Sequence, residues 1–155
     1  MLSECTTPLE VSPDKCFEFP LCSVYPAPSL YLGSIKFHKH YYQNIAAMNG
    51  EESKCAILID SHPKVRFWVR NLVRPDFAFW LPTSSDRFYP DFVALLSDGR
   101  FLDAEYKGAN IAPEESRDSA EKQTIGQLWE ARSAGRCLFR MLTLVNMQAE
   151  LDGIQ

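Results

Sequence analysis

The sequence predicts a single mixed α/β domain with an extended arm in front, and three observations lead to this prediction. The chain has 155 residues, of which 46% are hydrophobic, and this length suits one domain with one core. Apolar and aromatic segments typical of strands alternate with segments rich in Ala, Glu, Gln and Lys, which favour helix. Eight of the ten prolines lie before position 83, so the first part of the chain is expected to be extended and rich in turns.

Each element is predicted from its local pattern, and the order that follows the arm is helix, three strands, helix, strand. A helix is expected over residues 51–59, and a second helix begins at Pro63, a residue favoured in the first helical turn, and ends before Pro75. The last helix covers residues 113–133, because the Ala-Gly pair that follows stops it. Strands are expected at residues 77–81, 88–96, 101–107 and 137–145, and shorter ones in the arm at residues 30–32 and 34–37.

Composition and charge exclude several classes of protein. The formal net charge is −4, and only residues 62–110 are basic on balance, so any nucleic acid is expected to bind a local patch. No apolar run approaches the roughly 18–20 residues that span a bilayer, and the start of the chain lacks a signal-peptide pattern, so we expect a cytoplasmic protein without a membrane partner. Five scattered cysteines without a CxxC pair argue against a disulfide framework.

Three charged residues share one face of the strand expected at residues 101–107. Side chains alternate along a strand, so Asp103, Glu105 and Lys107 point the same way. The length of the loop before this strand decides which residues of the preceding strand lie opposite them. A two-residue Asp-Gly turn would place Asp91 on the face away from Glu105, whereas a three-residue loop with its glycine in the left-handed region would place Asp91 directly opposite Glu105. Both loops fit the sequence, and only the second assembles a site.

In that second arrangement the Cβ atoms of the two acidic residues lie roughly 5 Å apart. Their carboxylates repel each other unless a cation lies between them, and one or two carboxylates suit Mg²⁺. Lys107, further along the same face, would place a positive charge where an attacking water or a phosphate needs one. The pattern therefore predicts metal-assisted phosphate chemistry at Asp91, Glu105 and Lys107.

These residues resemble the signature of the PD-(D/E)xK nuclease superfamily, in which a Pro-Asp pair is followed by a Glu-x-Lys strand. Here the pair is Pro90-Asp91. More narrowly, residues 37–145 resemble the endonuclease domain at the C-terminal end of type III restriction subunits and related superfamily 2 helicases. Three further segments carry this resemblance: residues 39–42, the helix residues Glu52, Ala56 and Asp60, and the segment with Val65, Trp68, Val69 and Asn71. The chain departs from those proteins in having no residue between Tyr89 and Pro90, and it contains no GxxxxGK[ST] motif.

The resemblance implies a fold and an activity. The fold is restriction-endonuclease-like, with a mixed four-stranded sheet flanked by helices; residues 1–40 form the arm and residues 41–155 the nuclease-like domain. The activity is Mg²⁺-dependent hydrolysis of DNA phosphodiester bonds, with Mn²⁺ as a substitute metal. The implied partners are DNA, a helicase, translocase or modification subunit acting in restriction, defence or repair, and a second copy of the chain in a homodimer.

The resemblance also assigns roles to individual residues. Asp91, Glu105 and the backbone carbonyl of Tyr106 would bind the metal, and Glu52, the acidic residue of the first helix, would complete the metal shell directly or through water. Lys107 would orient the attacking water or stabilise the charge that develops on the phosphate. These five residues are the predicted catalytic and metal-binding set.

Three arginines, Arg66, Arg70 and Arg74, recur every four residues in the helix expected from Pro63. On a helix they would form one stripe, and the arginine fork matches phosphate oxygens, so they are predicted to contact nucleic acid. Lys122, on the helix that follows the Glu-x-Lys strand, is a further candidate. For all four residues the alternative is a solvated helix flank.

Two other functions stay open at this point. The same fold hosts inactive domains that only bind nucleic acid or dock proteins. A zinc site built from Cys16, Cys22, His38 and His40 would make the chain an interaction module, although the spacing of these residues matches no common zinc pattern. The choice between DNA and RNA as substrate also stays open.

Overall fold

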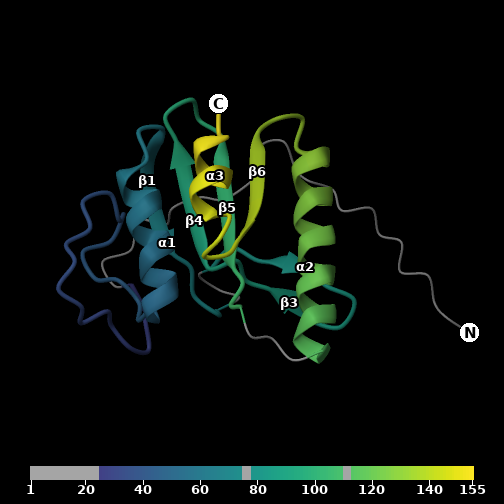
Figure 1. The fold of residues 1–155 in the computed structure, drawn as a ribbon, viewed down its shortest axis with the longest axis horizontal. Helices are drawn as coiled ribbons and strands as arrows, with labels where there is room; N and C mark the ends of the chain where they lie inside the picture. The colour runs from purple at the N-terminus through teal and green to yellow at the C-terminus, as the bar shows by residue number, and fades with distance from the viewer. Residues whose placement is uncertain (1–24, 75–77, 110–112) are drawn as a thin grey trace, which may run out of the picture.

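The computed structural model describes residues 25–74, 78–109 and 113–155 and is built on a four-stranded sheet with helices on both faces (Figure 1). The strand order across the sheet is β1 (Val65–Arg70), β4 (Phe92–Leu96), β5 (Phe101–Tyr106) and β6 (Cys137–Leu142). The pairs β1–β4 and β4–β5 are antiparallel, whereas β5 and β6 are parallel. The prediction of a mixed α/β domain with a mixed four-stranded sheet is therefore confirmed.

Helices cover both faces of this sheet. Helices α1 (Gly50–Ser61) and α3 (Met147–Asp152) lie on one face, and α2 (Pro113–Arg132) lies on the other (Figure 1). A second, two-stranded sheet of β2 (Leu81–Pro82) and β3 (Arg87–Phe88) packs beside α2. Within the described part of the chain, no helix has the length and apolar character needed to cross a membrane.

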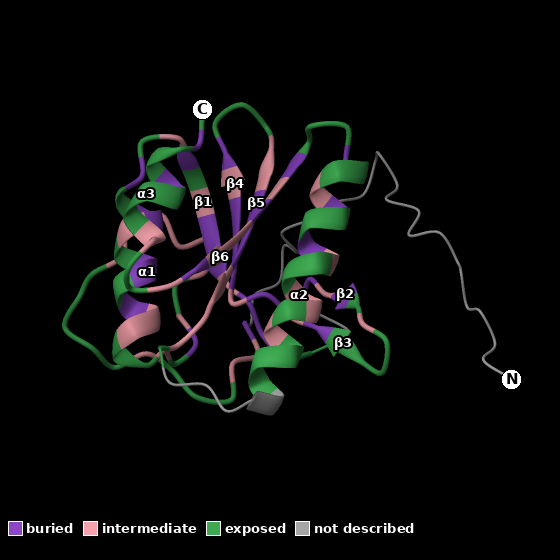
Figure 2. Ribbon diagram, turned by 45° about the vertical axis from the view of Figure 1, so that its right-hand side comes forward, coloured by how far each residue is buried: buried purple, intermediate pink, exposed green. Residues whose placement is uncertain are grey.

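The two faces of the main sheet pack against separate apolar clusters. Leu102 and Ala104 of β5 pack with Trp68 on the side of α1 and α3. Phe101 packs instead with Trp129 of α2 on the opposite side. Figure 2 shows the strands buried between the helical layers and the outer helix surfaces exposed. Because successive side chains of a strand point to opposite faces, the odd-numbered residues of β5 face α2.

Both edge strands of the main sheet are covered. At the β1 edge, the Tyr41 backbone N–H donates to the Trp68 carbonyl at 2.9 Å, and the Trp68 N–H donates to the Lys39 carbonyl at 3.0 Å. At the β6 edge, a Glu130 carboxylate oxygen accepts the hydrogen bond of the Phe139 N–H at 2.8 Å. These contacts occupy backbone groups that an exposed edge would offer to another strand.

The helix predicted between Pro63 and Pro75 is wrong, because this segment forms β1. Its β-branched and aromatic residues favour a strand, and pairing with β4 buries Trp68 completely. The strand predicted at residues 77–81 is reduced to Leu81–Pro82, with residues 75–77 outside the described part. The three strands predicted before the last helix therefore correspond to β1, β4 and β5 of the main sheet, and β1 takes the place of the strand predicted at residues 77–81.

Other boundaries differ in smaller ways. The strand predicted at residues 88–96 is divided into β3 and β4 by the segment that contains Pro90. The arm strands predicted at residues 30–32 and 34–37 are not formed; Leu30 makes only an isolated bridge with Ala46. The sequence did not predict α3. Residues 1–24 of the predicted arm lie outside the described residues.

Candidate functional site

The loop between β4 and β5 has the three-residue form. The Leu96 N–H donates to the Arg100 carbonyl at 2.8 Å, so these two residues close a loop of Ser97, Asp98 and Gly99. Gly99 has a φ of 89°, the left-handed region in which a glycine is unstrained. Of the two loops that the sequence allowed, the structure therefore has the one that assembles a site.

This loop fixes the register that brings the two acidic residues together. Phe92 of β4 lies opposite Ala104 of β5, so the next residue outward on each strand places Asp91 opposite Glu105. The Asp91 backbone N–H donates to Glu105 Oε2 at 3.1 Å. The predicted pairing of Asp91 with Glu105 is therefore confirmed, at the end of the sheet where β4 begins and β5 ends.

The Asp91 carboxylate is held from two sides. Its Oδ2 accepts the hydrogen bond of the Tyr106 backbone N–H at 2.8 Å, and its Oδ1 accepts from Arg70 Nη1 at 2.6 Å. The other terminal nitrogen of Arg70 lies 3.1 Å from Glu52 Oε1. The Arg70 guanidinium therefore lies between the carboxylates of Asp91 and Glu52, and only 13% of its side-chain surface is exposed.

Glu52 is fixed by the start of α1. Asn49 is the N-cap of this helix, and its side chain accepts hydrogen bonds from the backbone N–H groups of Glu51 and Glu52. Glu52 Oε2 accepts the Asn49 N–H in return at 2.9 Å, which completes a capping box. Glu51 accepts from the Tyr106 hydroxyl at 2.7 Å. The Glu52 carboxylate thus joins the helix cap to Arg70.

Glu105 is the more deeply buried partner of Asp91. Burial, and then the negative charge of Asp91, raise the pKa of the Glu105 carboxyl well above its usual range. Lys122 of α2 opposes this effect: its Nζ lies 3.4 Å from Glu105 Oε1 and 2.8 Å from Asp118 Oδ2. The structure therefore places Lys122 against the site rather than on a solvated flank.

Lys107 follows the last residue of β5. Its backbone N–H donates to the Leu142 carbonyl at 2.7 Å, which extends the alignment of β5 with β6 by one residue. Its side chain is half-buried, and no acidic residue of the described part of the chain forms an ion pair with its ammonium group. Lys107 therefore lies two residues beyond Glu105 along the chain, without an ion pair among the described residues.

Asp103 does not belong to the same site, although it shares the strand face. It lies between Val93 and Phe139 in the middle of the sheet and is 1% exposed. Among the described residues no group forms a hydrogen bond with either of its carboxylate oxygens. Burial therefore raises the pKa of the Asp103 carboxyl well above its usual range.

The structure separates the three predicted arginines. On a strand, Arg66 and Arg70 cannot form a helical stripe with Arg74, so that geometric prediction is wrong. Arg66 is exposed, with its guanidinium over the Phe67 ring, and Arg74 is an exposed residue beyond the end of β1. Of the three, Arg70 contacts Asp91 and Glu52. Phosphate contact by these arginines stays a prediction.

His40 has a structural role. Its Nδ1 lies 2.8 Å from the Tyr42 carbonyl, and its Nε2 accepts the Arg70 backbone N–H at 3.1 Å, so the ring is neutral with both nitrogens used. Burial lowers the pKa of His40 to about 4. Cys16 and Cys22, the other ligands of the zinc hypothesis, lie outside the described residues.

The acidic pair has donor atoms that suit a hard cation. An ionised carboxylate offers about four lone-pair positions. Asp91 uses one position on each oxygen for Arg70 and Tyr106, and Glu105 uses one on each oxygen for Asp91 and Lys122. Oxygen positions therefore remain on both residues. Within the described residues, however, no three His, Cys, Asp or Glu side chains are grouped closely enough to hold a metal ion, and Glu52 contacts Arg70.

The site as a whole is a set of connected charged residues in which Arg70 and Lys122 lie on either side of the acidic pair. We call it the charged cluster, and its members are Glu52, Arg70, Asp91, Glu105 and Lys122. Sequence reasoning predicted these residues individually but missed that Arg70 joins Glu52 to Asp91 and that Lys122 pairs with Glu105. Comparison with protein-family models, curated proteins and solved structures found no match to this chain.

Proposed function

We propose that the chain is a metal-dependent nuclease domain of the PD-(D/E)xK type, which hydrolyses phosphodiester bonds of DNA. The observation that carries this proposal is the hairpin register that places Asp91 opposite Glu105. Two partly buried carboxylates, with Lys107 two residues beyond Glu105, are the residue types that phosphate hydrolysis at a metal uses. The restriction-endonuclease-like form of the fold belongs to the same proposal.

Each residue of the site has a task in this reaction. Asp91, Glu105 and the Tyr106 carbonyl would hold the Mg²⁺ or Mn²⁺ ion, and a bound metal polarises the scissile phosphate and lowers the pKa of its water. Lys107 stabilises negative charge on the phosphate. Arg70 fixes the direction of the Asp91 carboxylate. Glu52 would complete the metal shell directly or through water, and its two oxygens already contact Arg70 and the Asn49 backbone N–H.

The setting in which the domain acts is part of the proposal. The partners are DNA and a helicase, translocase or modification subunit that works in restriction, defence or repair. The domain acts in the cytoplasm. It acts as a homodimer where cleavage of both DNA strands requires two sites. This domain would then cleave the DNA, and the helicase, translocase or modification subunit would recognise the target.

One observation favours a second candidate, an inactive nucleic-acid-binding or docking domain on the same scaffold. Arg70 and Lys122 already place positive charge against Asp91 and Glu105. Such ion pairs would neutralise the acidic residues in a protein that never binds a metal.

Cleavage of supercoiled plasmid DNA separates the two candidates. The wild-type chain is expected to nick the plasmid with Mg²⁺ or Mn²⁺ and not with EDTA, and a parallel reaction with RNA tests the substrate class. Glu105→Gln is expected to lower the rate by about 10³-fold, because it removes a charged metal ligand. Glu150→Gln, a change at an exposed acidic residue of α3, is the matched control and leaves the rate unchanged. A wild-type chain that binds DNA and does not cleave it with either metal contradicts the proposal and supports the second candidate.

A further inference from the structure

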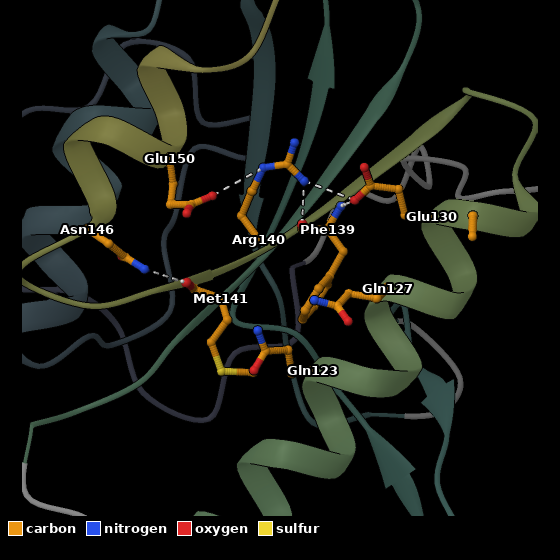
Figure 3. Close-up of a pocket in the computed structure, with 9 residues that line it drawn as sticks. Gln123, Gln127, Glu130, Phe139, Arg140, Met141, Asn146 and Glu150 are labelled. Carbon is orange, nitrogen blue, oxygen red and sulfur yellow. Dashed lines mark hydrogen bonds and ion pairs between the residues drawn. The ribbon is translucent and has the colours of Figure 1, made fainter.

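Backbone carbonyls at the open edge of β6 show how this fold treats groups that no neighbouring strand pairs. Arg140 Nη1 donates to the Phe139 carbonyl at 2.6 Å, and Asn146 Nδ2 donates to the Met141 carbonyl at 3.1 Å (Figure 3). These four residues line a cavity of about 480 Å³ between α2, β6 and α3. At this edge, side chains therefore serve as the donors that a further strand would otherwise supply.

At the charged cluster the ladder between β4 and β5 ends in a different way. The paired residues of these two strands stop at Phe92 and Ala104. Two residues further along β5 lies Tyr106, whose neighbour Lys107 donates its backbone N–H to β6. Because the N–H and C=O groups of successive strand residues point to opposite sides, those of Tyr106 point toward β4.

The residue that would lie opposite Tyr106 in a longer ladder is Pro90. Asp91 lies opposite Glu105, so the next pair outward would join Pro90 to Tyr106. Proline has no backbone N–H, so Pro90 has no hydrogen to donate to the Tyr106 carbonyl. Pro90 is also fully buried, and the chain bends directly after it, at Asp91. The proline therefore accounts for the end of the β4–β5 ladder at this position.

Tyr106 is nevertheless held firmly at its other polar groups. Its backbone N–H donates to Asp91 Oδ2 at 2.8 Å, and its hydroxyl donates to Glu51 Oε2 at 2.7 Å. Its ring packs against the apolar cluster on the side of α1 and α3. The direction of the Tyr106 carbonyl is thus fixed from both ends of the residue, while the ladder with β4 supplies no donor to it.

A carbonyl in this position completes what the acidic pair lacks. Within the part of the chain that the structure describes, Asp91 and Glu105 are not joined by a third acidic, His or Cys side chain in a group that could hold a metal ion. A hard cation accepts backbone carbonyl oxygens as ligands together with carboxylates. The Tyr106 carbonyl belongs to the residue that contacts Asp91, so it is the backbone oxygen best placed to be the third ligand.

We propose that Pro90 is a positioning residue of the metal site, which ends the β4–β5 ladder and so keeps the Tyr106 carbonyl available as an oxygen ligand. This inference rests on the proposed function, because the carbonyl is a ligand only if Asp91 and Glu105 bind a metal. The two residues of the Pro-Asp pair then have complementary tasks: Asp91 accepts the Tyr106 N–H, and Pro90 withholds a donor from the Tyr106 carbonyl.

Restoring the missing N–H tests this role. Pro90→Val supplies the donor and keeps an apolar side chain, of a type that favours strands, at the buried position. The new N–H is expected to bond to the Tyr106 carbonyl and to bring the β4 backbone against that oxygen. Binding of Mn²⁺ to the metal-free protein, measured by calorimetry, should weaken about tenfold, as for other residues that orient metal ligands. Pro82→Val makes the same change at an exposed residue of β2 and should leave the affinity unchanged.

A second measurement separates the added hydrogen bond from a change in packing. Hydrogen exchange of the new amide at position 90, followed by NMR in EDTA, reports directly on the extended ladder, and this amide is expected to be protected. Pro90→Ala, which adds the same N–H with a smaller side chain, is the second variant if Pro90→Val does not fold. Circular dichroism verifies that each variant is folded.

The outcomes distinguish the role of Pro90 from the metal site itself. Weaker Mn²⁺ binding together with a protected amide at position 90 supports the inference. Binding by the wild type with equal affinity in the Pro90 variant overturns the inference and leaves the proposed metal site intact. Weaker binding with an amide that exchanges freely assigns the proline to packing and also overturns the inference. A wild-type chain that binds no Mn²⁺ overturns the metal site and this inference together.

Discussion

Asp103 and Glu105 lie two residues apart on the same face of β5, and yet their surroundings are opposite. Glu105, at the end of the sheet, accepts a hydrogen bond from the Asp91 backbone and pairs with Lys122. Asp103, in the middle of the sheet, forms no hydrogen bond with any described residue. Burial raises the pKa of both carboxyl groups. Position along one strand therefore decides whether a buried acidic residue becomes part of a site.

This difference shows that hydrogen-bond and ion-pair partners, and not burial alone, distinguish the candidate site from the rest of the strand. A buried charge is costly unless other groups compensate it, and the charged cluster supplies such groups from α1, β1 and α2. Asp103 lies between the apolar residues Val93 and Phe139 of the neighbouring strands, and no described residue forms a hydrogen bond with its carboxylate. We therefore expect substitutions in the charged cluster to affect metal binding and stability together, and substitutions at Asp103 to affect stability alone.

The largest effect is expected when a partner is removed from the charged cluster. Arg70→Met leaves the carboxylates of Asp91 and Glu52 without the cation between them, so the free energy of unfolding should fall by about 4 kcal/mol in metal-free buffer. Urea denaturation measures this change. Mg²⁺ should restore more stability to Arg70→Met than to the wild type, because the metal replaces the lost charge. An equal Mg²⁺ effect on both proteins would contradict this account of Arg70.

A smaller effect is expected at His40, a half-buried group with two hydrogen-bond partners. His40 has a pKa of about 4 in the folded protein, below its ordinary value of 6.5 in the unfolded chain. The unfolded chain therefore binds a proton first, so the stability that neutral His40 contributes is complete above pH 6.5 and is lost as the pH falls toward 4, by up to about 3 kcal/mol. His40→Gln should lose less stability over this pH range, whereas exposed His38→Gln should behave as the wild type. Identical pH profiles for all three proteins would contradict the prediction.

The smallest effect is expected at Asp103, which has no hydrogen-bond partner among the described residues. Asp103→Val replaces an unpartnered buried carboxyl by an apolar group in an apolar surrounding, so the free energy of unfolding should rise by about 2 kcal/mol at neutral pH. Thermal denaturation measures the change. Cleavage by the variant should equal that of the wild type. A marked loss of stability in Asp103→Val would show that Asp103 has a partner and would remove the contrast with Glu105.

The hairpin could be predicted from the sequence because its determinants are local. Strand alternation and the glycine at position 99 limited the register to two choices, and the structure has the one that pairs Asp91 with Glu105. The capping-box pattern of Asn49 and Glu52 was also present in the sequence and would have fixed the start of α1.

The strand β1 was predicted as a helix, although its β-branched and aromatic residues favour a strand. Arg66, Arg70 and Arg74 are four residues apart, and this spacing places residues on one face of a helix and equally on one face of a strand. Pairing with β4, a contact between segments distant in sequence, decides the outcome. The partners of Asp91 and Glu105, which are Arg70 and Lys122, depend on the same long-range packing.

The most direct test of the central claim is the binding of Mn²⁺ to the metal-free protein, followed by isothermal titration calorimetry. The account predicts that the wild type and Asp103→Val bind the ion with the same affinity and stoichiometry, and that Glu105→Gln binds it at least about tenfold more weakly, because Asp91 and Glu105 are the acidic metal ligands. Equal binding by Glu105→Gln and the wild type, or no binding by any of the three proteins, would contradict the claim that this pair forms a metal site.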